Sequence, residues 1–297
     1  MLVEEVTETE IFFRKDLVHY ILENQHQHSY LTDWYKECKS QLSDKMKSAE
    51  NYSYLNLGEI GRISFPYYKM GAVTTNNLFG IDELIILAFY HSKFRQNKRS
   101  RLLDLGANVG FHTIAAAKTG YKVDAYEPDP EHFRQLNKNI TSNSLQTAID
   151  PYEVAISTRN GVEEFVRVEG NSTSSHLAGS TGKTPYGPLK VFSVPTVSIN
   201  SVLNGEYQLV KMDVEGHEAA LLSCLSQGEI LKSHWILEVG SKNSAFEIFQ
   251  KIQSSDARAY SQKCNWEKVE KLENMPTHYS EGSVIISKSV PFERDKA

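Results

Sequence analysis

The sequence contains no long apolar run. Its best stretch, Leu84–Tyr90, is seven residues long, whereas a helix that crosses a bilayer needs about 20 apolar residues. We therefore predict no membrane span. The first residues, MLVEEVTETEIFFRKD, lack a basic start followed by an apolar core, so no signal peptide is expected and the predicted location is the cytoplasm.

Cysteine is scarce, with single residues at Cys38, Cys224 and Cys264. An odd number of widely spaced cysteines does not make a disulfide framework. Without a CxxC pair or a Cys/His cluster, no zinc site is expected either. This usage agrees with a reducing compartment.

Basic residues are not in excess. Lys and Arg number 32 against 37 Asp and Glu, giving a net charge of −5. This balance argues against a nucleic-acid partner, because phosphate binding usually leaves a basic surface. The remaining composition, 40% hydrophobic and 23% charged, is ordinary for a globular protein. The 297 residues are enough for one full α/β domain and an accessory segment.

From about residue 100 the chain alternates between strand-like and helix-like segments. With helices between them, strands are predicted at 101–105, 122–126, 149–155, 208–214 and 235–239. Such alternation is typical of a parallel sheet with right-handed crossovers and helices on both faces. We assign residues 81–297 to this α/β domain and residues 1–80 to an N-terminal accessory segment.

The accessory segment is predicted to be helical to about residue 50 and to form a β-hairpin within 51–80. His26 and His28 fall in a polar stretch. Histidines two residues apart do not share a helix face, so a solvated segment is expected there rather than a metal site. A second irregular region, 170–188, is rich in Gly, Ser, Thr and Pro and is predicted to be a loop that acts as a lid.

The segment RLLDLGANVGFHTIAAA carries the first candidate site. A short apolar strand with Asp104 turns through Gly106 and Gly110 into a helix. Glycine permits a sharp turn and a close approach of the backbone to a ligand. The next strand ends at Glu127, where doubly wound folds place an acid that binds ribose hydroxyls. The unit therefore predicts a ligand that contains a nucleoside.

Two cofactor classes compete for this unit. A dinucleotide site normally reads G-x-G-x-x-G, with the pyrophosphate at the helix N-terminus, but Asn108 replaces the second glycine. Asp104 would repel a pyrophosphate, and it suits a cationic amino-acid and sulfonium ligand. We therefore predict S-adenosylmethionine. The alternative without a cofactor is a glycine turn with incidental acids.

Position assigns a role to each residue of the unit. The loop is expected to line the methionine part of the ligand at Gly106, Ala107, Asn108 and Gly110. Asp104 is expected near the ligand's ammonium group, and Glu127 at its ribose. Glu153, after the third strand, is expected beside the adenine or, alternatively, at the protein surface.

The segment QLVKMDVEGHEAALL carries the second candidate site. A buried strand ends at Asp213, and Glu215 and His217 follow through a glycine turn into a helix. Ligands of open α/β sheets collect at the carboxyl ends of strands, so these three side chains are predicted to meet the acceptor. Asp213, Glu215 and Glu238, which ends the fifth strand, are also candidate Mg²⁺ ligands. Alternatively, such acids bind acceptor hydroxyls directly.

A catalytic base is expected at this second site. Methyl transfer from a sulfonium is an in-line displacement, in which positioning does most of the work, and an alcohol acceptor also benefits from a base. His217 lies in the first turn of a predicted helix, where the dipole disfavours the charged imidazole, so we predict that it is this base. Alternatively, His217 only forms a hydrogen bond near the helix cap, and Glu218 is a helix-start charge.

These segments together resemble the FkbM family of methyltransferases. Between about residues 101 and 225, and in the family's order, the matching pieces are LDLGANVGFHTIAAA, AYEPDPEHFRQLNKNI, AISTRNGVEEF and KMDVEGHEAALL. The resemblance implies a Rossmann-like class I methyltransferase fold with a mostly parallel seven-stranded sheet, S-adenosylmethionine as cofactor, and O-methylation of hydroxyls on sugars or natural products. Family members usually carry an aspartate where this chain has Asn200, so its acceptor or binding mode can differ.

The sequence thus predicts an O-methyltransferase for a carbohydrate or small-molecule acceptor. Residues 1–80 are expected to close over the cofactor or to contact a second copy in a homodimer. A second interpretation is N-methylation of an amine or a protein, but the Asn/Asp-Pro-Pro-aromatic run of many such enzymes is replaced here by DVEG. A third is a non-catalytic cofactor-binding subunit, against which the intact glycines and Glu127 count.

Overall fold

The computed structural model describes residues 1–47, 49–97, 100–180, 187–203 and 205–292. Its largest element is an eight-stranded sheet with the order β17-β16-β18-β15-β14-β7-β8-β9. In chain order its strands are β7 (Arg101–Leu105), β8 (Lys122–Tyr126), β9 (Ile149–Tyr152), β14 (Leu209–Met212), β15 (His234–Leu237), β16 (Arg258–Ser261), β17 (Glu267–Lys268) and β18 (Val284–Ser287).

The strand directions follow the expected α/β pattern. Five consecutive strands of the sheet run parallel to one another, namely β9, β8, β7, β14 and β15. At the far edge, β18 runs antiparallel to both β15 and β16. The predicted mostly parallel sheet is confirmed. The expected number of seven strands is exceeded by one, because the two-residue strand β17 extends the edge.

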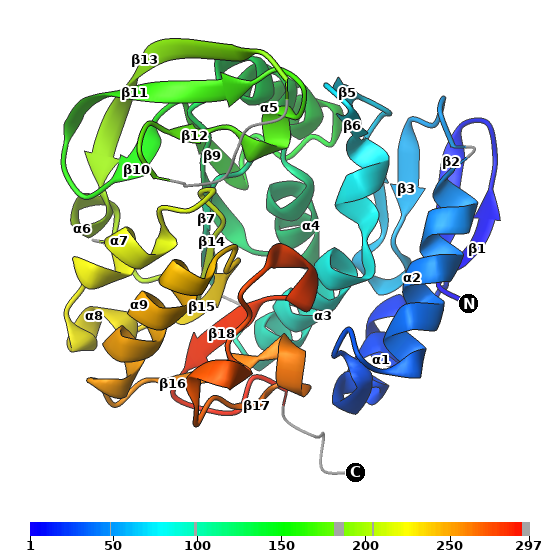
Figure 1. Cartoon of the computed structure of the whole chain (residues 1–297). Helices are drawn as coiled ribbons and strands as arrows, with labels where there is room; N and C mark the ends of the chain where they lie inside the picture. Colours follow the sequence, from blue (N-terminus) through cyan, green and yellow to red (C-terminus); the bar gives the residue numbers. More distant parts are fainter. Residues whose placement is uncertain (48, 98–99, 181–186, 204, 293–297) are drawn as a thin grey trace.

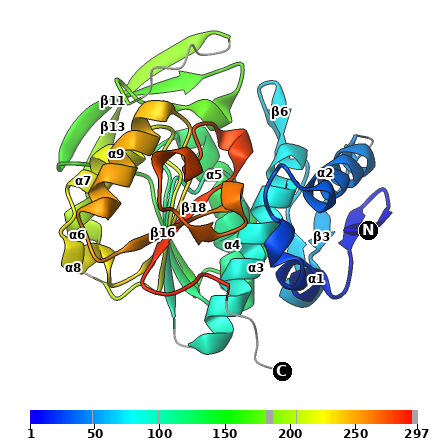
Figure 2. The same ribbon diagram turned by 60° about the horizontal axis from the view of Figure 1, so that its bottom comes forward.

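Helices cover both faces of the main sheet (Figure 2). One face carries α3 (Ile81–Gln96), α4 (Phe111–Thr119) and α5 (Pro130–Ser142), and the other α6 (Ile199–Val202), α7 (Glu218–Ser223), α8 (Gln227–Ile230) and α9 (Lys242–Gln253). Because successive side chains of a strand point to opposite faces, neighbours on one strand join different apolar clusters. Leu102 packs with the first set of helices and Leu103 with the second.

A second, four-stranded sheet lies beyond the carboxyl ends of the main strands (Figure 1). It has the order β10-β13-β11-β12 and consists of β10 (Ala155–Ser157), β11 (Gly161–Val168), β12 (His176–Leu177) and β13 (Leu189–Ser198). The predicted loop 170–188 is irregular only in part, because it contains the 3-10 turn η4 (Ser172–Ser174) and strand β12. Residues 181–186 of that prediction lie outside the described residues.

The accessory segment mixes strands and helices. Its elements are β1 (Val3–Val6), β2 (Glu10–Phe13), α1 (Leu17–Glu23), α2 (Asp33–Met46), β3 (Tyr54–Asn56), β4 (Arg62–Ser64), β5 (Lys69–Met70) and β6 (Val73–Thr74). The prediction of helix throughout residues 1–50 is therefore wrong for residues 3–13. Burial in Glu10–Phe13 alternates along the chain, which is the period of a strand with one buried face.

The accessory segment shares one apolar core with the α/β part. Buried residues of β2, α1, α2 and β3 belong to the same cluster as those of α3 and α4. The β5–β6 hairpin confirms the expected hairpin, and its tip contacts the second sheet. Gly71 pairs with Asn171, and the Ala72 N–H donates to the Gly170 carbonyl at 2.7 Å. The assignment of residues 1–80 as a separate unit stays a prediction.

The solvated environment predicted for His28 is wrong. Its side chain is fully buried, its Nδ1 accepts a hydrogen bond from Trp266 Nε1 at 2.8 Å, and its Nε2 donates to the Ile21 carbonyl at 2.9 Å. Burial lowers the pKa of His28 to about 4, so the ring is neutral and joins the accessory segment to the C-terminal region.

Among the described residues, no helix is both long and apolar enough to cross a bilayer.

Candidate active site

A cavity of about 620 Å³, open to solvent, lies between the two sheets. Its floor, formed by the ends of β7, β8 and β14, consists of Gly106, Asn108, Tyr126, Glu127, Pro128, Asp213, Val214, Glu215 and His217. Its cover, formed by the second sheet and η4, consists of Ala155, Ile156, Phe165, Ser172, Thr173, Ser175, His176 and Leu177. His132 of α5 completes the lining.

Gly106 fixes the corner at the end of β7. Its φ is 83°, and a Cβ atom there would lie 1.9 Å from the Asp213 carbonyl oxygen. The N–H groups of Gly106 and Ala107 both donate to the Tyr126 carbonyl at 3.0 Å. No larger residue fits this junction of three strands, which leaves the backbone open toward the cavity. Gly110, with a φ of 94°, caps the start of α4.

Glu127 is held by backbone donors on both oxygens. The Asn108 N–H donates to its Oε2 and the Asp129 N–H to its Oε1, each at 2.8 Å. Asn108 has a φ of 52°, a conformation that asparagine tolerates better than most residues. Burial raises the pKa of Glu127 to about 8. The carboxyl group is thus fixed at the cavity, as a ribose-binding acid would be, although that role stays a prediction.

Asp104 does not line the cavity. Its side chain is fully buried beneath the floor, where Oδ2 accepts a hydrogen bond from Thr113 at 2.5 Å and Oδ1 lies 3.6 Å from Lys211 Nζ. The predicted contact with the ligand's ammonium group is therefore not supported. The more distant contact with Lys211 leaves Oδ1 without a hydrogen bond among the described residues.

Three further predicted residues also lie outside the lining. Ala107 and Gly110 belong to the corner loop but do not face the cavity. Glu153 is exposed to solvent away from it, which agrees with the surface alternative rather than with adenine binding. Asn200, where the family usually has aspartate, is exposed too, and its side chain donates to the Cys224 carbonyl.

Lys211 joins the two predicted sites. Its Nζ lies 3.3 Å from Asp213 Oδ2 and 3.4 Å from the Gly106 carbonyl oxygen, in addition to Asp104. Burial would lower the pKa of Lys211, but the two carboxylates raise it above its usual value. A charged lysine therefore neutralises acids below the floor.

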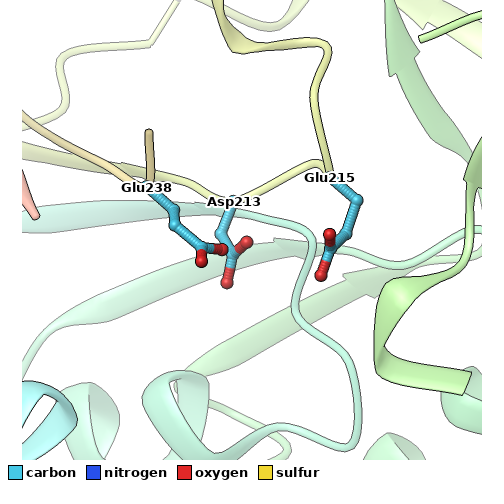
Figure 3. Close-up of side chains that lie close together, drawn as sticks. All are labelled: Asp213, Glu215 and Glu238. Carbon is cyan, nitrogen blue, oxygen red and sulfur yellow. The ribbon is translucent and has the colours of Figure 1, made fainter. Parts of the chain in front are cut away.

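Three carboxyl groups converge near the end of β14 (Figure 3). Oxygens of Asp213, Glu215 and Glu238 lie within 4.8 Å of one another, as predicted from the ends of two neighbouring strands. Burial would raise the pKa of Asp213, but Lys211 holds it below its ordinary value. Burial and the neighbouring carboxylates raise the pKa of Glu238 far above its ordinary value. Within this pair the proton therefore favours Glu238 over Asp213.

Glu218 shapes the turn that carries Glu215 and His217. Glu215 and Gly216 have φ values of 53° and 102°, a conformation that needs support. The buried carboxylate of Glu218 accepts hydrogen bonds from the N–H groups of Val214 at 2.9 Å and Gly216 at 3.1 Å. Sequence reasoning treated Glu218 only as a helix-start charge and missed this contribution.

His217 lines the cavity at the start of α7. Its Nε2 atom is buried and has no hydrogen-bond partner among the described residues. Burial lowers the pKa of His217, so its imidazole is neutral near pH 7. A neutral imidazole has one unprotonated ring nitrogen, which is able to accept a proton.

Sequence reasoning missed the polar groups of the cover. His132 Nε2 forms a 2.8 Å hydrogen bond with Ser172 Oγ. His176 Nδ1 lies 2.9 Å from the Ser174 carbonyl oxygen. A carbonyl only accepts, so Nδ1 carries the proton and Nε2 of the neutral ring is an acceptor. The only signal in the sequence was the abundance of serine and threonine in a region already predicted to be functional.

The comparison with protein families decides what kind of enzyme site this is. Residues 104–265, more than half of the chain, match the profile described as the methyltransferase FkbM domain. The chain belongs to the FkbM methyltransferase family. Membership implies S-adenosylmethionine as the methyl donor. The FkbM domain begins at Asp104 in β7 and includes the floor, the cover and the carboxyl cluster.

Solved structures overlap with this chain more loosely. A methyltransferase FkbM from Methylobacillus flagellatus KT is 12% identical with a TM-score of 0.40, over 71% of this chain and 52% of that one. The chain thus spans about half the length of that structure. A precorrin-6y C5,15-methyltransferase from Geobacter metallireducens GS-15 is 10% identical with a TM-score of 0.39, over 74% of this chain and 97% of that one. No curated protein matches.

Proposed function

We propose that this FkbM protein transfers a methyl group from S-adenosylmethionine to a hydroxyl of a sugar, a glycan or a related natural product. The observation that carries the proposal is His217, a neutral imidazole with an unpartnered, buried Nε2 in the cavity of a methyltransferase. An alcohol needs a base more than an unprotonated amine does. The imidazoles and hydroxyls of the cover suit an acceptor that is rich in hydroxyls.

The floor supports the cofactor side of the proposal. The missing side chain at Gly106 leaves the end of β7 accessible, and Glu127 presents a carboxyl fixed by two N–H groups. In this proposal the backbone at Gly106 and Asn108 faces the methionine part and Glu127 binds the ribose hydroxyls. The bound cofactor supplies an electrophilic methyl group.

The second site supports the acceptor side. Asp213 and Glu215 accept hydrogen bonds from acceptor hydroxyls and orient one of them toward the methyl carbon. As the new oxygen–carbon bond forms and the carbon–sulfur bond breaks, His217 Nε2 takes the hydroxyl proton. Glu218 keeps His217 in place by fixing the turn before α7.

The cofactor assignment is tested by titration calorimetry with S-adenosylhomocysteine. We expect Glu127→Ala to weaken binding at least tenfold, because about two hydrogen bonds to a charged group are lost. Glu153→Ala is the matched control, since this exposed glutamate lies outside the cavity, and it should bind like the wild type. Absence of binding by the folded wild type would refute the proposed function.

The base assignment is tested by methyl release from labelled S-adenosylmethionine against a panel of glycans, polyols and amines. We expect turnover with a hydroxyl acceptor, and a loss of about 10²–10⁴ in kcat for His217→Ala with unchanged affinity for S-adenosylhomocysteine. His176→Ala, which changes another imidazole of the cavity, serves as comparison. Normal turnover by His217→Ala, or methylation of amines alone, contradicts the assignment.

We further propose that Asp213, Glu215 and Glu238 bind Mg²⁺. Carboxylate oxygens are the ligands that this ion prefers, and oxygens of these three residues lie within 4.8 Å of one another. Mg²⁺ should raise the melting temperature of the wild type but not of Glu238→Gln, and EDTA should reduce methyl release. Equal melting temperatures with and without Mg²⁺ would leave the three acids to bind acceptor hydroxyls directly.

A further inference from the structure

The floor and the cover form one cavity only while the second sheet keeps its position over the ends of the main strands. Eight of its lining residues belong to the second sheet and η4, and nine to the main sheet and its loops. The two sheets share no strand. Contacts between side chains therefore contribute to positioning the cover, and one of them involves a buried arginine.

Arg167 of β11 is almost completely buried, with 6% of its surface exposed. Its guanidinium group forms two hydrogen bonds with Asp129, from Nε at 2.6 Å and from Nη2 at 2.5 Å. Its Nη1 forms an ion pair with Glu131, and its Cζ lies 5.2 Å from the centre of the Phe192 ring. Such a two-pronged contact fixes orientation as well as distance.

Asp129 connects this contact to the predicted cofactor site. Its N–H donates to Glu127 Oε1 at 2.8 Å. Its carboxylate is fully buried and also accepts from the Glu131 N–H at 2.8 Å, which caps α5. Only one residue therefore separates the carboxyl of the floor from the anchor of the cover.

A weaker contact lies next to this anchor. His132, three residues after Asp129, is hydrogen-bonded to Ser172 of η4, and both side chains line the cavity. The first turn of α5 thus contacts the cover twice, once through a buried ion pair and once through a neutral hydrogen bond.

We infer that Arg167 is a positioning residue for cofactor binding, which sets the cover against the floor by holding the segment that carries Glu127 and Asp129. The inference rests on the proposed function in that the ligand of this cavity is the methyl donor. Without the arginine, the carboxylate of Asp129 is left buried without its main partner, and an unpaired buried charge is strongly unfavourable. The segment then rearranges, and with it the orientation of Glu127 and the position of Phe165 and η4.

The test is calorimetric titration of the full chain with S-adenosylhomocysteine. We expect Arg167→Met to weaken binding at least tenfold, and Arg167→Lys to weaken it less, because lysine keeps the charge without the planar fork. Arg159→Met is the matched control, since this arginine of the same region is largely exposed and paired only at 3.8 Å with Glu163. It should bind like the wild type.

If Arg167→Met does not fold, Asp129→Asn tests the same contact between Arg167 and Asp129. Asparagine remains a good helix cap, so this variant removes the ion pair while it preserves the start of α5. The double variant should bind no more weakly than the worse single variant, because both changes break one contact. Ligand binding should slow amide hydrogen exchange in residues 161–177 of the wild type but not in those of Arg167→Met. If Arg167 only stabilised the fold, ligand binding would slow this exchange equally in both proteins.

The outcomes separate this inference from the proposed function. If the wild type does not bind S-adenosylhomocysteine, the proposed function fails. If the wild type binds and folded Arg167→Met binds within twofold of it, or if the effects of the two single variants multiply in the double variant, the inference about Arg167 is overturned.

Discussion

The floor and the cover of the cavity hold their polar groups by different means. In the floor, backbone N–H groups fix Glu127 and the side chain of Glu218 fixes the turn after β14. In the cover, side chains hold other side chains, as Arg167 and His132 do. Changes to Lys211 and Gly106, which support the floor, should therefore disturb folding, whereas loss of a neutral hydrogen bond in the cover should mainly alter binding.

The largest effect is expected from Lys211→Met beneath the floor. The variant leaves the buried carboxylate of Asp104 and the half-buried carboxylate of Asp213 without their cation, and breaking a buried ion pair typically costs about 3–5 kcal/mol. Urea denaturation should show this loss of unfolding free energy. Lys268→Met, in which an exposed ion pair with Glu270 is removed, should change it by less than about 1 kcal/mol. Similar stability of the two variants would contradict the difference.

Gly106→Ala should follow, with a loss of about 2–3 kcal/mol. The added methyl would overlap the Asp213 carbonyl oxygen. Gly61→Ala separates this overlap from backbone strain, because Gly61 also has a positive φ, 94°, but nothing lies within 4 Å of its added Cβ. It should cost about 1 kcal/mol. Equal losses in urea denaturation would show that strain alone makes Gly106 necessary.

The affinity for S-adenosylhomocysteine should depend on pH through Glu127. With a pKa of about 8, its ionised fraction rises about fivefold between pH 7 and pH 8, and a ribose site needs the ionised form. Binding should strengthen by about that factor in calorimetry, and the dependence should disappear in Glu127→Gln.

The same group also affects stability without ligand, with the opposite sign. The folded protein retains a proton that the unfolded chain releases above about pH 4.5, so its unfolding free energy should decrease as the pH rises from 4.5 through 8. Glu127→Gln should lack this contribution in melting experiments. A wild-type profile identical to that of the variant would show that the Glu127 carboxyl is already ionised at neutral pH.

The smallest effect is expected for Ser172→Ala in the cover. It removes the neutral hydrogen bond with His132, worth about 0.5–1.5 kcal/mol at most. Affinity for S-adenosylhomocysteine should fall about twofold, with unfolding free energy nearly unchanged. A loss as large as that of Lys211→Met would abolish the distinction between floor and cover.

Sequence reasoning predicted the floor because its constraints are local. The glycine at 106, the acid at 127 and the alternation that brings Asp213 and Glu215 together are all set by backbone geometry within one strand and turn. The parallel direction of the main strands follows from the alternation of strands and helices along the chain. This is why the parallel sheet and the convergence of Asp213, Glu215 and Glu238 were both expected.

The cover could not be predicted because its contacts join distant residues. Nothing in the sequence pairs Arg167 with Asp129, 38 positions apart, or His132 with Ser172, 40 positions apart. The buried surroundings of Asp104 were not foreseen for a related reason. Its position near the ligand seemed set by the strand end, but the partner that takes its side chain inward, Lys211, comes from a strand more than 100 residues later.

The contact between the β5–β6 hairpin and the residues just before η4 limits how these two segments can change during evolution. A Cβ at Gly71 would lie 2.5 Å from the Glu169 carbonyl oxygen, so a larger residue at position 71 requires a shift of the backbone at Glu169. We expect the tip of the β5–β6 hairpin and the residues just before η4 to change together when acceptor preference changes during evolution. A chimaera that swaps only one of them should misplace the serines of η4 even though every residue of the floor is retained.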